Sequence, residues 1–230
     1  MPPVLSGKRA ALRDLPPSII FSDIDTQPIH RVAVDALRPT QMAVGMRAVE
    51  AKREKLARLT KRPRKLTHYL QRRAIPAVLG PGEELYIIDH HHLSLALFQS
   101  GVPDTFVRVV ADFSNRRRLA FLRAMQAHGW LRSCDGEGRT ISPVLLPATV
   151  GHLQADHYRD LAWSVREAGG FRKSPIPYSE FVWADFFREH IPAELVQQDF
   201  LSAHRSAMRI ARSRSASHLP GCKRGKSLSD

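Results

Sequence analysis

The sequence predicts an α+β fold, in which a small mixed α/β core (residues 29–112) is followed by a helical extension (residues 113–210) packed on it. Two observations predict this fold class. In the first half, short runs of β-branched and aliphatic residues alternate with segments of helical spacing. In the second half, apolar residues recur mainly at helical spacing. With 230 residues, 43% of them hydrophobic, the chain is long enough to bury a sizeable core.

The predicted core runs strand, helix, β-hairpin, helix, strand. Its elements are a strand at residues 29–36, a helix from Gln41 to about Leu59, a short helix at 66–73, hairpin strands at 75–80 and 85–89, a buried helix around 93–97, and a strand at 105–110. Thr40 is predicted to cap the first helix, because its hydroxyl can accept a hydrogen bond from the first turn. Pro39 is predicted to break the first strand, and Gly101 to end the buried helix.

The second half is predicted to contain four helices. They cover residues 116–128, the stretch around 158–165, residues 178–192, and Ala193 to about Ile210. The aromatic side chains of Trp163, Trp183, Phe186 and Phe187 are expected to form part of a hydrophobic core, which explains them without a cofactor.

Both ends of the chain are expected to lie outside these elements. Residues 1–28 are rich in proline and are predicted to be irregular, and residues 211–230 are predicted to form a flexible basic tail. No apolar run approaches the roughly 20 residues needed to span a bilayer, and the N-terminus lacks the apolar core of a signal peptide. The two cysteines, Cys134 and Cys222, form no CxxC pair. We therefore expect a reducing, cytoplasmic setting.

The net charge of +13 is concentrated in two segments. Residues 47–73 hold 11 Lys/Arg and 2 Asp/Glu, and residues 201–230 hold 7 Lys/Arg and one Asp. Such patches attract nucleic acid, nucleotides or acidic surfaces. The alternative is a solvated helix face and a frayed tail. If nucleic acid binds, the predicted contacts are Lys52, Arg53, Lys61 and Arg62.

The stretch ELYIIDHHHLSLAL places an aspartate and three histidines where a strand is predicted to turn into a helix. Backbone N–H groups at a helix N-terminus bind anions, and imidazoles there can donate to phosphate oxygens. We therefore predict a phosphate-binding site at this turn. Its predicted phosphate-binding residues are His90, His91, His92, Thr40 and Lys65. Asp89, as base or Mg²⁺ partner, and His91 are the predicted catalytic residues, with Gln41 orienting the acceptor.

Simpler interpretations of the turn stay open. Three consecutive histidines cannot all point the same way, because neighbours in a helix diverge by roughly 100°. Asp89 can simply cap the helix. A zinc site would need Asp89 and two histidines, but the recurrent i, i+4 ligand spacing of HExxH is absent. No metal ligand is therefore predicted firmly, and Asp89 is the candidate.

Two stretches together resemble the ParB/sulfiredoxin-like superfamily, most closely its branch described as ParB-like nucleases: VAVDALRPTQMAVG at residues 32–45 and LYIIDHHHLSLAL at residues 85–97. The aromatic stretch at 169–191 also looks like the C-terminal part of proteins in this branch, so the resemblance extends to about residue 200. The Pro-Thr-Gln step at residues 39–41 matches the step that follows the first strand in ParB-like domains.

The superfamily signature is a strand that ends in Asp-Gly-His-His-Arg, or a variant, at the start of a helix. Asp89, His91 and His92 match it, whereas His90 stands where Gly is usual and Leu93 where Arg is usual. The missing Arg removes a bidentate phosphate donor, and the missing Gly removes easy access to positive φ.

The resemblance implies a nucleotide near the signature turn. The superfamily includes ParB proteins that bind a nucleotide and act as DNA clamps, sulfiredoxins that use ATP to repair an oxidised cysteine, and kinases of free serine. Sulfiredoxin repair is disfavoured because the turn has no cysteine, and a partition protein because no helix-turn-helix is recognisable.

Two functional hypotheses follow, from different classes. The first is a nucleotide-dependent enzyme that binds ATP or ADP, with Mg²⁺, at the Asp89–His92 turn and transfers or hydrolyses a phosphoryl group. The second is a nucleic-acid-binding protein, with or without nuclease activity, that uses the basic segment 47–73. A weaker third is an interaction module that keeps the fold without chemistry.

Overall fold

The computed structural model describes residues 27–174 and 178–223, which form two compact units. Of the described residues, the first unit contains 27–43, 49–135 and 139–154. The second contains 44–48, 136–138, 155–174 and 178–223. Two-residue strands, β3 (Ala43–Val44) and β7 (Gln154–Ala155), mark two points where the chain passes from one unit to the other.

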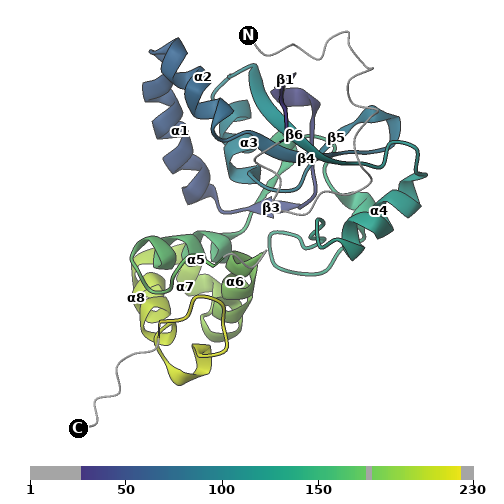
Figure 1. The fold of residues 1–230 in the computed structure, drawn as a ribbon. Helices are drawn as coiled ribbons and strands as arrows, with labels where there is room; N and C mark the ends of the chain where they lie inside the picture. Colours follow the sequence, from purple (N-terminus) through teal and green to yellow (C-terminus); the bar gives the residue numbers. More distant parts are fainter. Residues whose placement is uncertain (1–26, 175–177, 224–230) are drawn as a thin grey trace. The chain divides into compact units, whose positions relative to one another are not determined.

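A mixed sheet forms the centre of the first unit. Its strands are β1 (Ile29–Ala33), β2 (Leu37–Pro39), β4 (Ile75–Leu79), β5 (Leu85–Ile87) and β6 (Asp104–Asp112). Their spatial order is β1-β6-β4-β5-β2 (Figure 1). β4 and β5 pair antiparallel, which is the predicted β-hairpin, and Gly82 in its turn has φ 73°. The predicted α+β class is confirmed.

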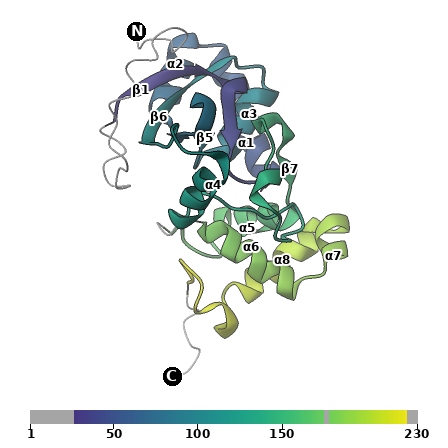
Figure 2. The same ribbon diagram turned by 90° about the vertical axis from the view of Figure 1, so that its right-hand side faces the viewer.

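Helices cover both faces of this sheet. They are α1 (Met46–Thr60), α2 (Pro63–Gln71), α3 (His91–Gln99) and α4 (Arg118–Ala127). α4 lies on one face, where Phe121 and Met125 join a hydrophobic cluster with Val78 and Tyr86 of the strands. α2 and α3 lie on the other side of the sheet (Figures 1 and 2). Because α4 is anchored in this way, the unit extends well past residue 112, where the prediction had ended the core domain.

Two predictions near the end of β1 are wrong. Pro39 does not break the first strand, which already ends at Ala33; it is the last residue of β2, which pairs parallel with β5 at the edge of the sheet, a position that tolerates proline. The first helix begins at Met46 and not at Gln41. Thr40 does not cap it, because its hydroxyl donates to the backbone oxygen of Ile87 at 2.8 Å. The Thr40 hydroxyl thus bonds to a residue far away in sequence instead of capping the helix that follows it.

The C-terminus of α3 follows the prediction closely. Gly101 has φ 64°, its N–H donates to the backbone oxygen of Phe98, and the N–H of Val102 donates to that of Leu97. These two bonds form a Schellman motif, which satisfies carbonyl groups at the helix end. Within the residues that the structure describes, no helix combines the length and apolar character that a membrane span requires.

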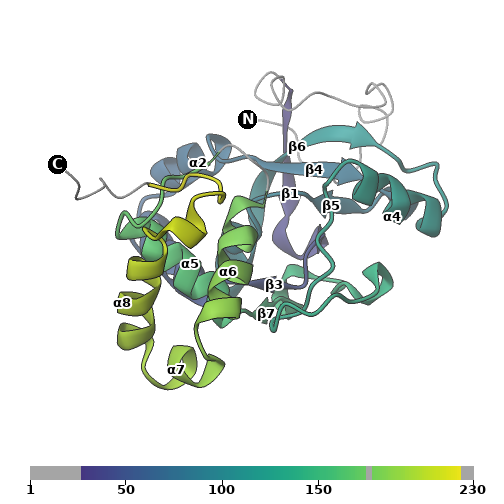
Figure 3. The same ribbon diagram turned by 90° about the horizontal axis from the view of Figure 1, so that it is seen from below.

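Four helices build the second unit: α5 (His157–Glu167), α6 (Ser179–His190), α7 (Ala193–Gln198) and α8 (Phe200–Ile210). α5 packs against α6 and α8 (Figure 3). The helix predicted from Ala193 to Ile210 is two helices, because Asp199 ends α7 and caps α8 by accepting from the N–H of Ser202 at 3.0 Å. Trp183 and Phe187 are fully buried in this unit, as predicted, whereas Trp163 is only half-buried.

The stretch after α8 is part of this unit's core. Ala211, Ala216 and Leu219 are buried in it, and the indole N–H of Trp183 donates to the backbone oxygen of Pro220 at 2.8 Å. The prediction of a flexible tail is therefore wrong for residues 211–223, because a few small apolar side chains suffice to fill the space beside Trp183. Residues 224–230, and residues 1–26 of the predicted irregular segment, lie outside the described part of the chain.

One buried ion pair joins α6 to the start of α5. Asp156 caps α5 by accepting from the N–H groups of Tyr158 and Arg159, and its side chain is 4% exposed. Arg188 Nη2 lies 3.0 Å from both of its carboxylate oxygens, and Arg188 Nη1 donates to Asp185 at 2.5 Å. The buried Asp156 carboxylate is thus compensated by two backbone N–H groups and by the Arg188 guanidinium.

Candidate functional site

The histidine turn joins β5 to α3. His90 precedes the helix and has φ 63° and ψ 23°, a left-handed conformation that is uncommon for a residue other than glycine. Asp89 Oδ1 accepts from the N–H of His90 at 2.6 Å. Among the residues that the structure describes, no side chain caps the N-terminus of α3, so Asp89 bonds within the turn and does not act as the helix cap.

His91 and Thr40 lie side by side, as the predicted phosphate site requires, but they bind each other. His91 is 4% exposed, and its Nε2 accepts from the N–H of Thr40 at 3.1 Å. The Thr40 hydroxyl lies 3.4 Å from the same nitrogen. This contact ties the end of β2 to the start of α3, and it requires Nε2 to be unprotonated.

The other predicted residues of the turn have different surroundings. Gln41 is 5% exposed and its amide donates to the backbone oxygen of Ala43 at 3.0 Å, whereas Asp89 is exposed. Burial lowers the pKa of His90, which lies near Asp89, Lys52 and the backbone of Arg73. His92 is half-buried at the first turn of α3. The turn therefore combines an exposed carboxylate with histidines in unequal environments.

Lys65 is not at the turn but on α2, where it is exposed with the other basic side chains. Across residues 27–174 and 178–223, no group of three His, Cys, Asp or Glu side chains is arranged to hold a metal ion. Within the same residues Cys134 and Cys222 are free. Asp89 can contribute one carboxylate to Mg²⁺, and further ligands would have to come from water or a bound phosphate.

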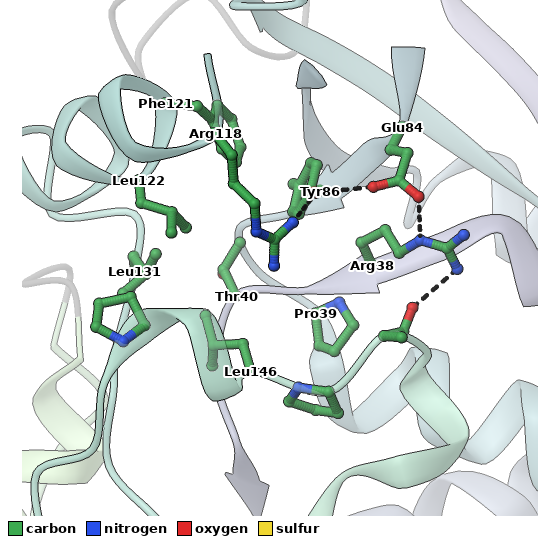
Figure 4. Close-up of a pocket in the computed structure, with 13 residues that line it drawn as sticks. Arg38, Pro39, Thr40, Glu84, Tyr86, Arg118, Phe121, Leu122, Leu131 and Leu146 are labelled. Carbon is green, nitrogen blue, oxygen red and sulfur yellow. Dashed lines mark hydrogen bonds and ion pairs between the residues drawn. The ribbon is translucent and has the colours of Figure 1, made fainter. Parts of the chain in front are cut away.

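A cavity of about 180 Å³ lies elsewhere in the first unit, between β2, β5 and α4. Its polar wall is a chain of four side chains (Figure 4). Arg38 Nε donates to Glu84 at 3.0 Å, the Tyr86 hydroxyl donates to the other oxygen of Glu84 at 2.8 Å, and Arg118 Nη1 lies 3.4 Å from the Tyr86 oxygen. The remaining wall is mostly apolar and includes Phe121, Leu122, Leu131 and Leu146.

This polar chain shifts the acidity of two of its members. Burial raises the pKa of the Tyr86 phenol, and the hydrogen bond to Glu84 adds to the increase. Burial alone would raise the pKa of Glu84, but hydrogen bonds from Tyr86 and Arg38 outweigh it, and the pKa of Glu84 is lowered. Glu84 is therefore ionised and Tyr86 protonated at neutral pH.

Thr40 is the one predicted site residue among the described residues that line this cavity. Asp89, His91 and Gln41 are not part of its wall. The cavity was not predicted from the sequence, although one signal was present: Glu84, directly before β5, and Tyr86 are two residues apart and so point to the same side, because side chains alternate along an extended chain. The structure adds Arg38, which pairs with Tyr86 across the parallel strands.

The basic segment forms a helical hairpin, α1, α2 and the turn between them, which we call the basic hairpin (Figure 1). The exposed cations of residues 49–73 are Lys55, Arg58, Lys61, Arg62, Arg64, Lys65, Arg72 and Arg73. The predicted contacts Lys52 and Arg53 are half-buried, and Arg53 pairs with Glu50 at 2.6 Å. Lys61 and Arg62, also predicted, lie between α1 and α2, and Arg64 and Lys65 lie in the first turn of α2. We call these four residues the hairpin tip.

A sequence profile of the protein family described as "Putative ParB-like nuclease" matches residues 30–189. That match spans more than half of the chain and both units. The chain belongs to this ParB-like family. The predicted resemblance is confirmed, including its extension beyond residue 112 into the aromatic helix α6.

This ParB-like chain is also similar to a solved structure, that of protein Atu1540 from Agrobacterium tumefaciens. The two share 37% sequence identity with a TM-score of 0.77, over 86% of this chain and 100% of the other. None of the curated proteins compared with the chain matches it.

The backbone of His90 accords with the resemblance described above, which expects glycine at this position. His90 adopts the positive φ that glycine adopts easily. The substitution of the usual glycine therefore preserves the left-handed turn but stores strain in it, of order 1–2 kcal/mol for a residue with a Cβ.

A pair of variants tests this strain. We expect His90→Gly to be more stable than His90→Ala by about 1 kcal/mol, because both remove the ring and only alanine retains a Cβ in the left-handed region. Chemical denaturation measures the difference. At the helical position His92 the order should reverse, with alanine about 1 kcal/mol better than glycine. An alanine variant at position 90 as stable as the glycine variant would contradict the left-handed backbone.

Proposed function

We propose that this ParB-like protein binds nucleic acid, and that the basic hairpin makes the phosphate contacts. The observation that carries the proposal is the charge of this one surface: residues 47–73 hold 11 Lys/Arg against 2 Asp/Glu, and most of these cations are exposed. The family's description as a nuclease supports the same class of partner. The proposal covers a protein that only binds the strand and one that also cleaves it as a nuclease.

The hairpin tip is the part of this surface best suited to phosphate. Lys61, Arg62, Arg64 and Lys65 are all exposed and lie within five consecutive positions around the start of α2. By contrast Arg53 has a carboxylate partner in Glu50, and Lys52 is half-buried near His90. The tip can therefore approach a phosphate backbone without breaking an ion pair of the kind that holds Arg53.

Salt dependence of binding tests the proposal. Fluorescence anisotropy with labelled single-stranded DNA, double-stranded DNA and RNA should show an affinity that falls linearly in log–log form with salt. Four phosphate contacts predict a slope of about −3 to −4, because each contact releases counterions. Gel analysis of the same samples with Mg²⁺ shows whether the strand is cleaved. Binding that does not change with salt, or no binding to any of the three, would reject the proposal.

A second proposal concerns the histidine turn: that ATP or ADP, with Mg²⁺, binds there and undergoes phosphoryl transfer or hydrolysis. The specific observation in its favour is the N-terminus of α3, which has no side-chain cap and lies next to the exposed carboxylate of Asp89. Backbone N–H groups and His92 would face the phosphates and Asp89 would hold Mg²⁺. His91 would keep its bond to Thr40 and so act by positioning.

Calorimetry distinguishes this second proposal from the first. With ATP or ADP and Mg²⁺ we expect measurable heat for the native protein and at least a tenfold weaker affinity for Asp89→Asn, which is about 1.4 kcal/mol. Asp35→Asn, another exposed aspartate of the first unit, is the control and should bind normally. No heat from folded protein with either nucleotide would end this proposal and leave nucleic-acid binding untouched.

A further inference from the structure

We propose that the cavity between β2, β5 and α4 is a binding site for a small amphipathic anion, a carboxylate or phosphate monoester attached to an apolar body of about one ring. This site is separate from the basic hairpin, and it meets the histidine turn through Thr40, which lines the cavity and donates to His91. Polar and apolar side chains both line it (Figure 4).

The charges of the polar wall leave one cation available. Arg38 is paired with Glu84 and donates a second hydrogen bond to the backbone oxygen of Ala148 at 2.8 Å. The Tyr86 hydroxyl donates its hydrogen bond to Glu84. Arg118 makes the long 3.4 Å contact to Tyr86 and attracts the Glu84 carboxylate at longer range, but among the described residues it has no ion pair within 4.0 Å. Its guanidinium therefore retains donors that match a carboxylate or phosphate.

The position of Arg118 adds a second reason for an anion. Arg118 is the first residue of α4, follows Arg116 and Arg117, and no side chain caps this helix. Three cations at a helix N-terminus oppose the positive end of the helix dipole, whereas an anion there is favoured. A bound carboxylate or phosphate next to Arg118 offsets this conflict directly, whereas the Glu84 carboxylate of the polar wall acts on Arg118 only from beyond ion-pair distance.

The size of the cavity limits the ligand. A dry cavity of about 150 Å³ holds one benzene molecule. At about 180 Å³ this cavity has room for one ring with an acidic group and is too small to enclose a nucleotide. Phe121, Leu122, Leu131 and Leu146 provide the apolar surface on which such a ring would lie. The predicted ligand class is thus aromatic or compact aliphatic acids.

Nuclear magnetic resonance titration tests the site, with benzoate, phenyl phosphate and the neutral benzyl alcohol as probes. We expect at least one acid to saturate shifts of residues around the cavity, with a dissociation constant on the order of 1 mM for a ligand of this size. Benzyl alcohol should bind at least tenfold more weakly, because it cannot pair with Arg118. Comparison of the two acids shows which acidic group the site prefers.

Matched variants locate the contact. Arg118→Gln should weaken binding of the preferred acid at least tenfold, whereas Arg117→Gln, an equal charge change one residue away and outside the cavity wall, should alter it by less than twofold. Both residues are exposed, so neither variant is expected to unfold the unit. The proposal is overturned if neither acid saturates, if benzyl alcohol binds as well, or if Arg118→Gln binds normally. Nucleic-acid binding by the hairpin tip would be unaffected by any of these results.

Discussion

Neutralising the hairpin tip with Lys61→Gln, Arg62→Gln, Arg64→Gln and Lys65→Gln is expected to lower nucleic-acid affinity by about 100- to 1000-fold at roughly 0.1 M salt. The physical reason is the loss of counterion release, since each lost phosphate contact removes close to one unit of salt slope. All four side chains are exposed, so the protein should stay folded. Anisotropy over a salt series measures both the affinity and the change in slope.

The second unit offers a control of equal charge. Arg205, Arg209, Arg212 and Arg214 are also exposed, and their joint change to glutamine removes four positive charges from α8 and the segment after it. If binding is local to the tip, this variant should lose less than about tenfold, through long-range attraction only. Equal losses in both variants would show that net charge, and not the basic hairpin, determines binding.

An intermediate variant separates the tip from the rest of the hairpin. Lys52, Arg53, Lys61 and Arg62, the contacts expected from sequence, include only two tip residues. Because Arg53 is paired with Glu50, their joint neutralisation should cost fewer phosphate contacts than the tip variant does. If this variant loses more nucleic-acid affinity than the tip variant, the phosphate contacts lie closer to the body of α1 than we propose.

Removing Arg188 is expected to destabilise the second unit by about 3–5 kcal/mol, because it leaves a buried carboxylate uncompensated. Arg188→Met keeps much of the side-chain volume but removes the charge partner of Asp156, whose side chain is 4% exposed. Denaturant unfolding followed through Trp183, which is fully buried in this unit, measures the loss. Arg188→Lys keeps the charge and should lose less.

A double-mutant cycle identifies the cause. Adding Asp156→Asn to Arg188→Met should restore part of the lost stability, because a neutral amide in place of the carboxylate needs no charge partner. Acidification should act in the same direction. Burial raises the pKa of Asp156 and Arg188 opposes that shift, so without Arg188 the folded state holds the proton to a higher pH than the unfolded chain does. The loss of stability in Arg188→Met should therefore be greatest above the folded-state pKa of Asp156 and shrink as the pH falls through it. A loss that changes neither with Asp156→Asn nor with pH would indicate lost packing alone.

Local sequence signals determined a large part of this protein. The β-hairpin at residues 75–89, the glycine end of α3 at Gly101 and the concentration of cations in α1 and α2 were all readable, because each depends on residues close together in the chain. The signature turn with its family resemblance was readable for the same reason, as a contiguous run of residues.

What only the tertiary structure decided depends on partners far away in sequence. The local pattern made Thr40 a helix cap, yet its hydroxyl binds Ile87 and its N–H binds His91, so the predicted site residues were paired with each other. The sequence does not reveal a cavity that needs β2, β5 and α4 at once. Nor does it reveal that Ala211 and Leu219 return to cover Trp183. Short-range periodicity specifies which elements form, whereas burial and hydrogen bonding between distant segments specify which side chains remain available for a ligand.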